Sequence, residues 1–379
     1  MSKAQAAKLK KLYGLALKTG APVVGFYDSV GGRLNQGTEL LAGCGDVLNA
    51  AASLSGVVPQ ISVVLGTCLG TNALNAASAD IVIMSKDAQL SLSVTGKHSD
   101  AAYNAENGIA SIVCDDADKA IKAAKELILY LPSNNLTMAP QSFEEAPAED
   151  GCGCVVSRTV DGNSIVKLFN DYGKEANVRF ARLGGQVVGI VVTKGKELGC
   201  KSANKVAKFV RFCDAFNIPL VSLVDVPGFL PGTGQEYNGV ILHGAKLLYA
   251  YGEATVPKVT ITLRKSYGGS HIVMSCKQLR GDMNYAWPTA EIAVMGGAGA
   301  VEVLYAREAK EQENPAAFLA EKEAEYTKLF ANPYNAAKYG YIDDVIEPRN
   351  TRFRIIRALQ QLQTKKLTNP AKKHGNIPL

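Results

Sequence analysis

Glycine-rich turns are the features of this sequence with the clearest chemical potential. Four β-rich runs end in such turns, at residues 28–33, 66–71, 225–232 and 264–269. A turn of this kind that leads into a helix points free backbone N–H groups and the positive end of the helix dipole at one place, which suits an oxyanion. The turns are also consistent with glycine serving only tight strand-to-helix connections. Their paired occurrence favours the chemical interpretation.

Other catalytic patterns are missing from the sequence. It contains no Ser-His-Asp order, nucleophile elbow, HExxH helix or P-loop. His98 and His374 lie among polar residues, whereas His243 and His271 lie near expected elements, where a structural hydrogen bond is the simpler role. Stabilisation of charge by backbone groups is therefore the chemistry that the residues favour.

The composition is that of a folded protein whose partners are not nucleic acids. The 379 residues are 47% hydrophobic and 20% charged, and the net charge is +6 with Lys and Arg scattered among acids. Eight cysteines show no disulfide or metal spacing apart from Cys152-Gly-Cys154, so we expect no bound metal. The N-terminus lacks the apolar block of a secretory signal, and the uncharged run 47–79 contains Pro and Gly, which predicts a cytoplasmic chain without a membrane span.

An internal repeat organises the elements that carry these turns. In residues 8–28, apolar residues at helical spacing lead through a short turn to a β-rich run that ends in Asp. The same pattern returns 197 residues later, in residues 205–225. Residues 57–61 match residues 255–259 at nearly the same offset of 198. Each copy therefore predicts a helix, a turn and a buried strand, followed by a second strand.

A third match extends the repeat and defines two domains. Residues 79–84 resemble residues 290–295 at an offset of 211, so the second copy is expected to carry about thirteen extra residues there. Three blocks in the same order predict two homologous α/β domains. We place their boundaries at residues 1–130 and 154–379, with residues 131–153 as a polar linker.

The two copies differ in what precedes the first helix. Residues 177–194 of the second copy read as two strands joined at Arg-Leu-Gly-Gly-Gln, a hairpin turn. The first copy has no such lead-in. The first sheet is therefore expected either to lack an edge or to receive it from another polypeptide, because an uncovered apolar edge invites aggregation.

Several long motifs carry a family resemblance. Residues 225–251 read DVPGFLPGTGQEYNGVILHGAKLLYAY, and RKSYGG follows at residues 264–269. Residues 279–296 and the terminal KHGNIPL add to the pattern. Together they resemble the carboxyltransferase subunit of biotin-dependent acyl-CoA carboxylases, with the propionyl-CoA carboxylase β chain as the nearest type and decarboxylase and transcarboxylase subunits as relatives. The resemblance implies two tandem crotonase-like domains, each a ββα superhelix, the first lacking its N-terminal strands.

The resemblance also implies two oxyanion holes. The hole in the N-domain would hold the enolate of an acyl-CoA, and the hole in the C-domain would hold the ureido oxygen of biotin. By motif, the first hole comprises Gly31, Gly32, Gly70 and Thr71, and the second comprises Gly228, Phe229, Gly268 and Gly269.

Neighbouring residues are implied to bind substrate. Arg33 would meet a CoA phosphate or a substrate carboxylate, although an exposed surface position fits it equally well. Tyr267 and Trp287 would line the biotin channel, with packing in the core as the alternative, and Ser270 completes the second motif.

The implied mechanism needs no general base from the protein, because carboxybiotin supplies both carbon dioxide and the base that takes the α-proton. The chain contains no biotin-acceptor Met-Lys-Met and no ATP-grasp signature. Biotin must therefore arrive on a partner, a biotin carboxyl carrier protein that works with a biotin carboxylase or a membrane decarboxylase subunit. The resemblance further implies a homo-oligomer, from dimer to hexamer, with active sites between the N-domain of one protomer and the C-domain of another.

Departures from the family pattern leave a second interpretation open. Strands that the family places before the first helix are missing, and the first motif reads Cys68-Leu-Gly-Thr-Asn. A separate chain would then complete the N-domain of an active subunit. Alternatively, the chain is a non-catalytic assembly subunit that only docks a biotinyl domain or stabilises an oligomer. The acyl group and the direction of transfer are not decided by the sequence.

Overall fold

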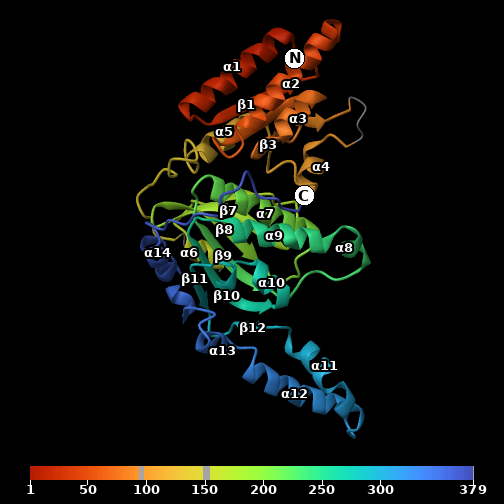
Figure 1. Cartoon of the computed structure of the whole chain (residues 1–379), viewed down its shortest axis with the longest axis vertical. Helices are drawn as coiled ribbons and strands as arrows, with labels where there is room; N and C mark the ends of the chain where they lie inside the picture. The colour runs from red at the N-terminus through yellow and green to blue at the C-terminus, as the bar shows by residue number, and fades with distance from the viewer. Residues whose placement is uncertain (94–97, 148–153, 379) are drawn as a thin grey trace.

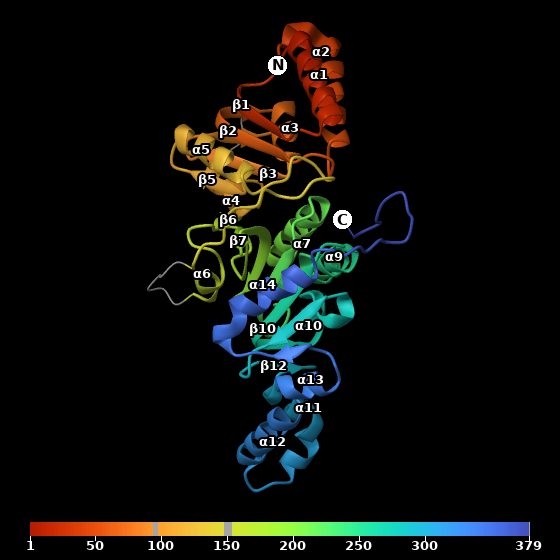
Figure 2. The same ribbon diagram turned by 90° about the vertical axis from the view of Figure 1, so that its left-hand side faces the viewer.

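Two β-sheets with helices on their faces form the architecture of the chain. The computed structural model describes residues 1–93, 98–147 and 154–378. Figures 1 and 2 show one sheet in each half of the chain, stacked along the long axis of the molecule. The α/β class predicted from the sequence is confirmed. No helix in the described residues is long and apolar enough to cross a membrane.

The N-terminal half forms an all-parallel sheet in the order β1-β2-β3-β5, with β4 paired to β2. Its elements are α1 (Lys3–Thr19), β1 (Val23–Ser29), α2 (Gly37–Ser53), β2 (Gln60–Leu69), α3 (Thr71–Ala77), β3 (Ile81–Ser85), β4 (Gln89–Ser91), α4 (Ala101–Glu106), β5 (Ile112–Cys114) and α5 (Ala117–Ile128).

The C-terminal half forms a mixed sheet in the order β13-β11-β10-β9-β8-β7-β6, with β12 paired to β10. Among the strands of this sheet that the structure describes, β7 pairs antiparallel with β6 and β8, and the other pairings are parallel. The elements are α6 (Val155–Thr159), β6 (Val166–Leu168), β7 (Ala176–Leu183), β8 (Gln186–Thr193), α7 (Cys200–Ala215), β9 (Leu220–Val226), α8 (Thr233–Tyr237), α9 (Val240–Glu253), β10 (Lys258–Tyr267), α10 (Gly268–Val273), β11 (Met283–Ala286), β12 (Glu291–Ala293), α11 (Gly297–Lys310), α12 (Pro315–Leu329), α13 (Pro333–Lys338), β13 (Asp344–Val345) and α14 (Thr351–Gln361).

The register of the strands confirms the first two blocks of the repeat. β1 and β2 pair in the first half as β9 and β10 pair in the second, and both pairs shift register at the same place. Equivalent pairs are Val23–Gln60 and Leu220–Lys258 before the shift, and Ser29–Cys68 and Val226–Ser266 after it. The two halves are therefore structural copies at offsets of 197 and 198.

The third predicted match of the repeat is wrong. Ile81 of β3 lies opposite Ile61, and Met283 of β11 lies opposite Val259, so the counterpart of β3 is β11 rather than β12. β12 corresponds to β4, since both pair with the end of the longer strand beyond the register shift. The offset is 202, and the second copy carries four extra residues instead of thirteen. Short apolar runs look alike, and only pairing distinguishes β3 from β12.

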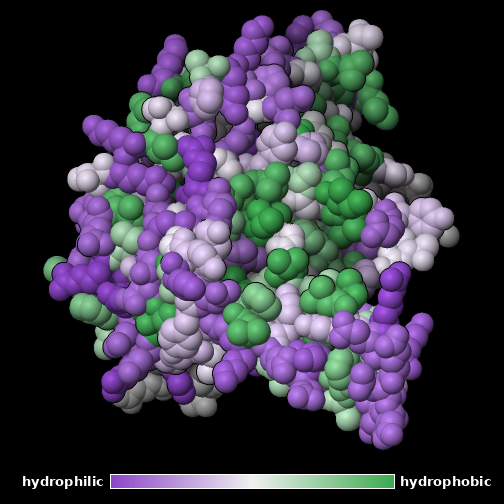
Figure 3. Space-filling view, turned by 60° about the horizontal axis from the view of Figure 1, so that its bottom comes forward, coloured by the Kyte–Doolittle hydropathy of each residue, from purple (hydrophilic) through white to green (hydrophobic). Residues whose placement is uncertain are grey.

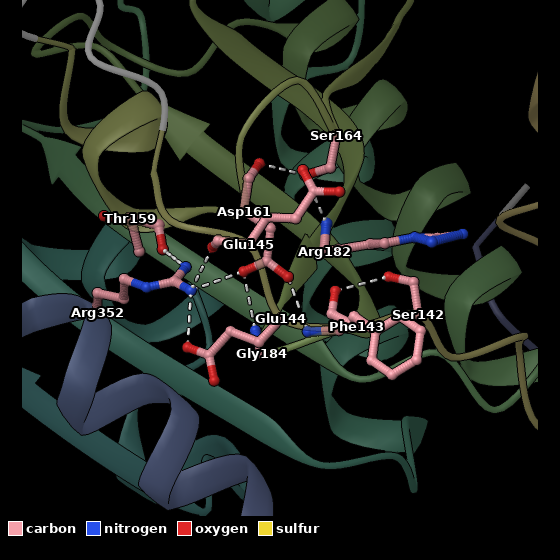
Figure 4. A network of polar contacts seen from close by, with 11 residues as sticks. Ser142, Phe143, Glu144, Glu145, Thr159, Asp161, Ser164, Arg182, Gly184 and Arg352 are labelled. Carbon is pink, nitrogen blue, oxygen red and sulfur yellow. Dashed lines mark hydrogen bonds and ion pairs between the residues drawn. The ribbon is translucent and has the colours of Figure 1, made fainter.

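The predicted hairpin before the second helix is confirmed, and its turn is fastened to the chain that joins the two halves (Figure 4). Gly184 and Gly185 both have positive φ, as a two-residue hairpin turn requires. The buried carboxylate of Asp161 accepts both of their N–H groups, at 3.0 and 2.7 Å, and forms an ion pair with Arg352 at 2.8 Å. Ser142 donates its N–H to Gly185 O at 3.0 Å.

Residues 131–147 are held by both halves of the chain. Asn134 Nδ2 donates to Gly20 O at 3.0 Å, and Asn135 N donates to Val57 O at 2.9 Å. Asn217 of the second half donates to Asn135 O at 2.7 Å. These contacts order the described part of the predicted linker, while residues 148–153 lie outside the described residues. The domain boundaries stay a prediction.

One apolar core spans the two sheets. It combines residues of the first sheet and of α5 with residues of β7, α7 and α9, all almost fully buried. Examples are Ile61, Ile83 and Leu127 from the first half and Phe180 and Phe209 from the second. The halves therefore position each other through shared apolar burial, the dominant favourable contribution to folding.

A half-buried carboxyl group near this core, that of Asp80, predicts an unusual pH dependence. Burial raises the pKa of Asp80 to about 6, and its Oδ2 accepts the N–H of Gln60 at 2.8 Å. A raised carboxyl pKa means that stability is present at low pH and is lost as the pH rises toward 6. In Asp80→Asn the amide oxygen can keep the hydrogen bond. We expect the variant to be more stable than wild type at pH 7, by up to about 3 kcal/mol.

Urea unfolding of both proteins at pH 5 and pH 7.5 checks this expectation. The difference in unfolding free energy between Asp80→Asn and wild type should grow with pH. A difference that stays constant would show that Asp80 is ionised with an ordinary pKa.

Candidate oxyanion sites

The second glycine turn joins two strand ends that lie 40 residues apart in the chain. Gly228 and Phe229 follow β9, and Gly268 continues directly from β10 into α10. Gly268 has a φ of +54°, and a Cβ there would lie 2.9 Å from Val294 O, so a larger residue would be strained. A Cβ on Gly269 would lie 3.7 Å from the ring of Phe229. The structure therefore brings Phe229 and Gly269 together, as the motifs suggested.

Two backbone donors of this turn are available to a ligand. Gly269 is the second residue of α10, so its N–H has no intrahelical partner. Leu198 forms a parallel β-bridge with Phe229. The N–H of Leu198 donates to Gly228 O, and Leu198 O accepts the N–H of Leu230, both at 2.9 Å. In such a parallel bridge, the N–H of Phe229 points away from Leu198. The turn thus has donors suited to an oxyanion at the start of a helix.

An apolar hollow of about 380 Å³ adjoins these donors. It lies between the turn and helices α9 and α10, and apart from Glu236 its lining side chains are apolar. The lining residues are Phe229, Glu236, Val240, Ile241, Gly244, Ala245, Leu248, Gly269, Ile272 and Val273. Sequence reasoning found Gly269 but missed the lining residues of α9 and those that follow Gly269 in α10. The apolar spacing of Val240, Gly244 and Leu248 on one helical face was a usable signal. The hollow suits a neutral ring system with one polar edge.

A larger cavity of about 880 Å³ lies on the other side of Gly268 and Gly269. It is lined by β12, by residues of α12 and α13 and by aromatic side chains, which include Tyr326 of α12 and Phe330 and Tyr339 in the loops that follow the two helices. Figure 3 shows that exposed apolar side chains gather near the centre of one face of the molecule. Such surface is typical of an interaction site.

The predicted substrate-binding residues of the second site serve structural contacts. Tyr267 is buried and donates its hydroxyl to Glu291, and burial together with this carboxylate raises the pKa of the phenol. Ser270 is fully buried and donates to Tyr267 O at 2.7 Å. Trp287 Nε1 donates to Thr351 Oγ1 at 3.0 Å, in the core. These side chains make their hydrogen bonds within the fold. Contact of Tyr267 or Ser270 with substrate stays a prediction.

The histidines of the second half have different surroundings. His271 Nδ1 forms a hydrogen bond with Ser266 Oγ at 2.8 Å, and burial lowers the pKa of the imidazole. His243 Nδ1 is buried without a hydrogen-bond partner among the described residues. The first arrangement matches the structural role that the sequence favoured.

The first glycine turn is built like the second, except that one of its backbone N–H groups already has a hydrogen-bond acceptor within the fold. Gly31 and Gly70 have positive φ, of 126° and 65°. Gly70 donates its own N–H to Ser91 O at 3.0 Å, so the free donor at this helix start is Thr71, the first residue of α3. A Cβ on Gly32 would lie 2.5 Å from a methyl group of Leu40, which explains the second glycine of the motif.

Two further side chains complete the description of the first turn. Asn72 Nδ2 donates to Ser29 Oγ at 3.2 Å and ties α3 to the end of β1. The side chain of Arg33 is exposed and therefore accessible to an anionic ligand, and its contact with substrate stays a prediction. In the described residues, no group of three or more His, Cys, Asp or Glu side chains could hold a metal ion. Cys154 is exposed, and Cys152 lies outside the described residues.

Comparison with known proteins identifies the family. Residues 1–377 match the carboxyl transferase domain. The chain is 43% identical to the methylmalonyl-CoA decarboxylase subunit alpha of Propionigenium modestum, over 99% of this chain and 79% of the relative. It therefore belongs to the carboxyltransferase family. It is also 43% identical to the methylmalonyl-CoA carboxyltransferase 12S subunit of Propionibacterium freudenreichii subsp. shermanii, over 99% of this chain and 78% of that subunit.

Solved structures of this family share the fold. The transcarboxylase 12S hexamer with methylmalonyl-coenzyme A and methylmalonic acid bound superimposes with a TM-score of 0.93 at 41% identity. The alignment covers 100% of this chain and 79% of the 12S chain. A single-chain, multi-domain long-chain acyl-CoA carboxylase aligns with a TM-score of 0.78 at 25% identity, over 93% of this chain and 38% of the other. The predicted family is confirmed.

Proposed function

We propose that this chain is a carboxyltransferase subunit that moves a carboxyl group between biotin, carried by a partner protein, and the α-carbon of an acyl-CoA. The observation that carries this proposal is the second turn, where the N–H groups of Phe229 and Gly269 adjoin an apolar hollow. The two sheets with matching registers support the finer assignment of two tandem crotonase-like domains.

The residues of the second turn fit biotin. Its ureido oxygen would accept the N–H groups of Phe229 and Gly269, and its fused rings would occupy the hollow against Ile241, Gly244 and Ile272. When bound, carboxylated biotin supplies carbon dioxide and, after losing it, a base for the α-proton. The turn would stabilise negative charge on the ureido oxygen, a contribution of about 10²–10³ in rate for each well-placed donor.

The first turn fits the thioester. Thr71 N–H, together with the backbone of Gly31 and Gly32, would hold the carbonyl oxygen of the acyl-CoA as it becomes an enolate. Arg33 would meet a CoA phosphate. The chain then contributes orientation and electrostatic stabilisation, and no side chain needs to act as general base.

An oligomer would bring the two turns together. The transcarboxylase 12S protein assembles as a hexamer and forms a multienzyme core. Large apolar side chains are exposed in both halves of this chain, Leu34 and Leu74 in the first and Ile241 and Val294 in the second. We propose a homo-oligomer, from dimer to hexamer, in which the first half of one protomer faces the second half of another. Its partners would be a biotin carboxyl carrier protein and a biotin carboxylase or a membrane decarboxylase subunit.

An open sheet edge supports a further partner. In the second half, β8 pairs with β9, and Phe180 of β7 packs on Phe209 and Phe212 of α7, with ring centroids 5.2 and 5.8 Å apart. The equivalent residues of α1, Leu12 and Leu15, are 59% and 55% exposed. β1 is the edge of its sheet, and a hollow of about 580 Å³ lies beside it. We propose that a separate chain supplies a hairpin of the β7–β8 type, with one strand parallel to β1.

Charges on α1 are expected to block this hairpin without unfolding the chain. A labelled synthetic peptide with the sequence of residues 176–193 serves as the probe, and fluorescence anisotropy measures its binding. Leu12→Asp combined with Leu15→Asp should weaken binding at least about tenfold, because each charge would be desolvated. Since both leucines are exposed, the unfolding free energy should change by less than about 1 kcal/mol. Leu329→Asp, at another exposed apolar position, is the control. Equal binding by all variants would refute the site.

The proposed function is tested by transfer of the carboxyl group of malonyl-CoA or methylmalonyl-CoA to free biotin. The chain is assayed first alone and then with candidate partner chains. Turnover that saturates in both substrates supports a carboxyltransferase. A folded oligomer that binds a biotinyl domain but never transfers carboxyl would instead support the non-catalytic assembly subunit.

A further inference from the structure

One aspartate in each repeat bridges the two strand ends that carry a glycine turn. In the second half, Asp225 is the penultimate residue of β9, three residues before Gly228. Its Oδ1 accepts the N–H of Lys265 in β10 at 3.2 Å, four residues before Gly269. Its Oδ2 accepts Nε and Nη2 of Arg264 at 2.9 and 2.7 Å. The single carboxylate therefore connects the segments that lead to both proposed donors.

The first half repeats this contact at the equivalent atoms. Asp28 is the penultimate residue of β1, three residues before Gly31. Its Oδ1 accepts the N–H of Thr67 in β2 at 3.2 Å, and Thr67 precedes Gly70 by three residues. Thr67 and Lys265 are counterparts at the offset of 198 that relates β2 to β10. Two independent copies of the sequence thus preserve the same carboxylate-to-backbone bond.

The hydrogen bond between Asp225 and Lys265 spans a β-bulge that redirects β10. Between the pairs Val224–Thr262 and Val226–Ser266, three residues of β10 lie opposite the single residue Asp225. Beyond this bulge, β10 leaves β11 and pairs with β12, and its end turns into α10. Bulges next to functional sites re-aim the residues that follow them. A bulge N–H without a partner would leave the turn free to shift.

We propose that Asp225 and Asp28 are positioning residues, each of which holds the bulge that aims one oxyanion turn. This inference rests on the proposed function, because it assigns the turns to the two substrates. Asp225 would act on the turn for biotin, and Asp28 on the turn for the acyl-CoA. Neither carboxylate touches substrate.

The contacts of Asp225 and Asp28 differ in strength because a different residue occupies the bulge in each half. Arg264 in the second half corresponds to Gly66 in the first. A Cβ on Gly66 would collide with the Asp28 carboxylate, so the first bulge has no side chain to reinforce the bond. Asp225 has a nearly buried carboxylate, paired with Arg264, and its own N–H donates to Thr193 Oγ1 at 2.6 Å. The second turn is thus the more rigidly held.

Steady-state kinetics of carboxyl transfer to free biotin, with both substrates varied, tests the assignment. Asp225→Ala should lower kcat/KM for biotin on the order of 10²-fold, since displacement of a positioned group by about 1 Å has effects of that size. Its KM for the acyl-CoA should stay unchanged. Asp28→Ala should show the reverse pattern. Asp225→Asn should regain part of the loss, because its amide oxygen can still accept the Lys265 N–H.

Asp343→Ala is the matched control. Asp343 also accepts the N–H of a strand residue, Asn284, at 2.7 Å and pairs with Lys277, but neither contact involves a residue of a glycine turn. It should lose stability without a selective effect on either substrate. A general loss of stability would lower kcat only in proportion to the folded fraction and leave both KM values unchanged. If Asp225→Ala shows that pattern, or changes the KM for the acyl-CoA as much as the KM for biotin, the positioning role is refuted.

Amide hydrogen exchange provides a readout that does not need activity. In Asp225→Ala the amides of residues 264–269 should exchange faster than in wild type, and in Asp343→Ala they should not. Unchanged exchange in Asp225→Ala would overturn the inference even if the wild-type chain transfers no carboxyl group. The failure of the proposed function and the failure of this inference are therefore distinguishable.

Discussion

Gly269→Pro is expected to lower kcat for carboxyl transfer by about 10²–10³ while the chain stays folded. Proline has no N–H, so the variant removes one of the two donors proposed for the ureido oxygen, and loss of a single such donor has effects of this size. The fold should tolerate it because Gly269 lies in the first turn of α10, where the N–H bonds to no helical carbonyl. Transfer from malonyl-CoA to biotin measures kcat, and circular dichroism checks the fold.

Ala117→Pro is the control for this prediction. Ala117 is the first residue of α5, after Asp116, whose extended backbone suits a following proline. This variant places proline in a helical first turn that is remote from both glycine turns, and it should transfer carboxyl at the wild-type rate. Full activity of a folded Gly269→Pro protein would show that the N–H at this position does not stabilise the transition state.

Gly244→Leu should block the apolar hollow and lower kcat/KM for biotin by at least about 10²-fold. A Cβ on Gly244 already lies 3.1 Å from the ring of Phe229, so a leucine would fill the hollow and displace that ring together with its turn. Gly244 is in the interior of α9, where glycine costs about 1 kcal/mol relative to alanine, so the helix itself should not be weakened. The KM for the acyl-CoA should not change.

A glycine-to-leucine substitution at a position without close neighbours is the control, because it separates blocking of the hollow from a general effect of leucine in a helix. Gly14 lies in α1, and a Cβ there would meet no atom within 4 Å. Gly14→Leu should therefore keep wild-type kinetics with both substrates. If Gly244→Leu binds and carboxylates biotin normally, the hollow is not the biotin site, and the cavity on the other side of Gly268 becomes the alternative.

The sequence was sufficient for features that depend on local pattern. The helix, turn and strand of each copy, the hairpin at residues 184–185 and the glycine turns at residues 31–32 and 268–269 all follow from periodicity and turn chemistry. It failed at the third block of the repeat, because β3 and β12 are short apolar runs whose identity depends on their strand partners. It gave no sign that the hydroxyl groups of Tyr267 and Ser270 are engaged within the fold, and their contact with substrate stays a prediction.

The α/β class, the family and the residues of each turn could be predicted because contiguous motifs carry them. Which backbone donors of each turn are free depends on contacts between distant segments, because Gly70 donates its N–H to Ser91 O in a neighbouring strand. The tertiary structure likewise decides that Phe229 meets Gly269 beside a hollow and that Asp225 bridges two strands. These contacts join residues about 40 positions apart. Parallel pairing brings such residues together only after the intervening helix has packed on the sheet.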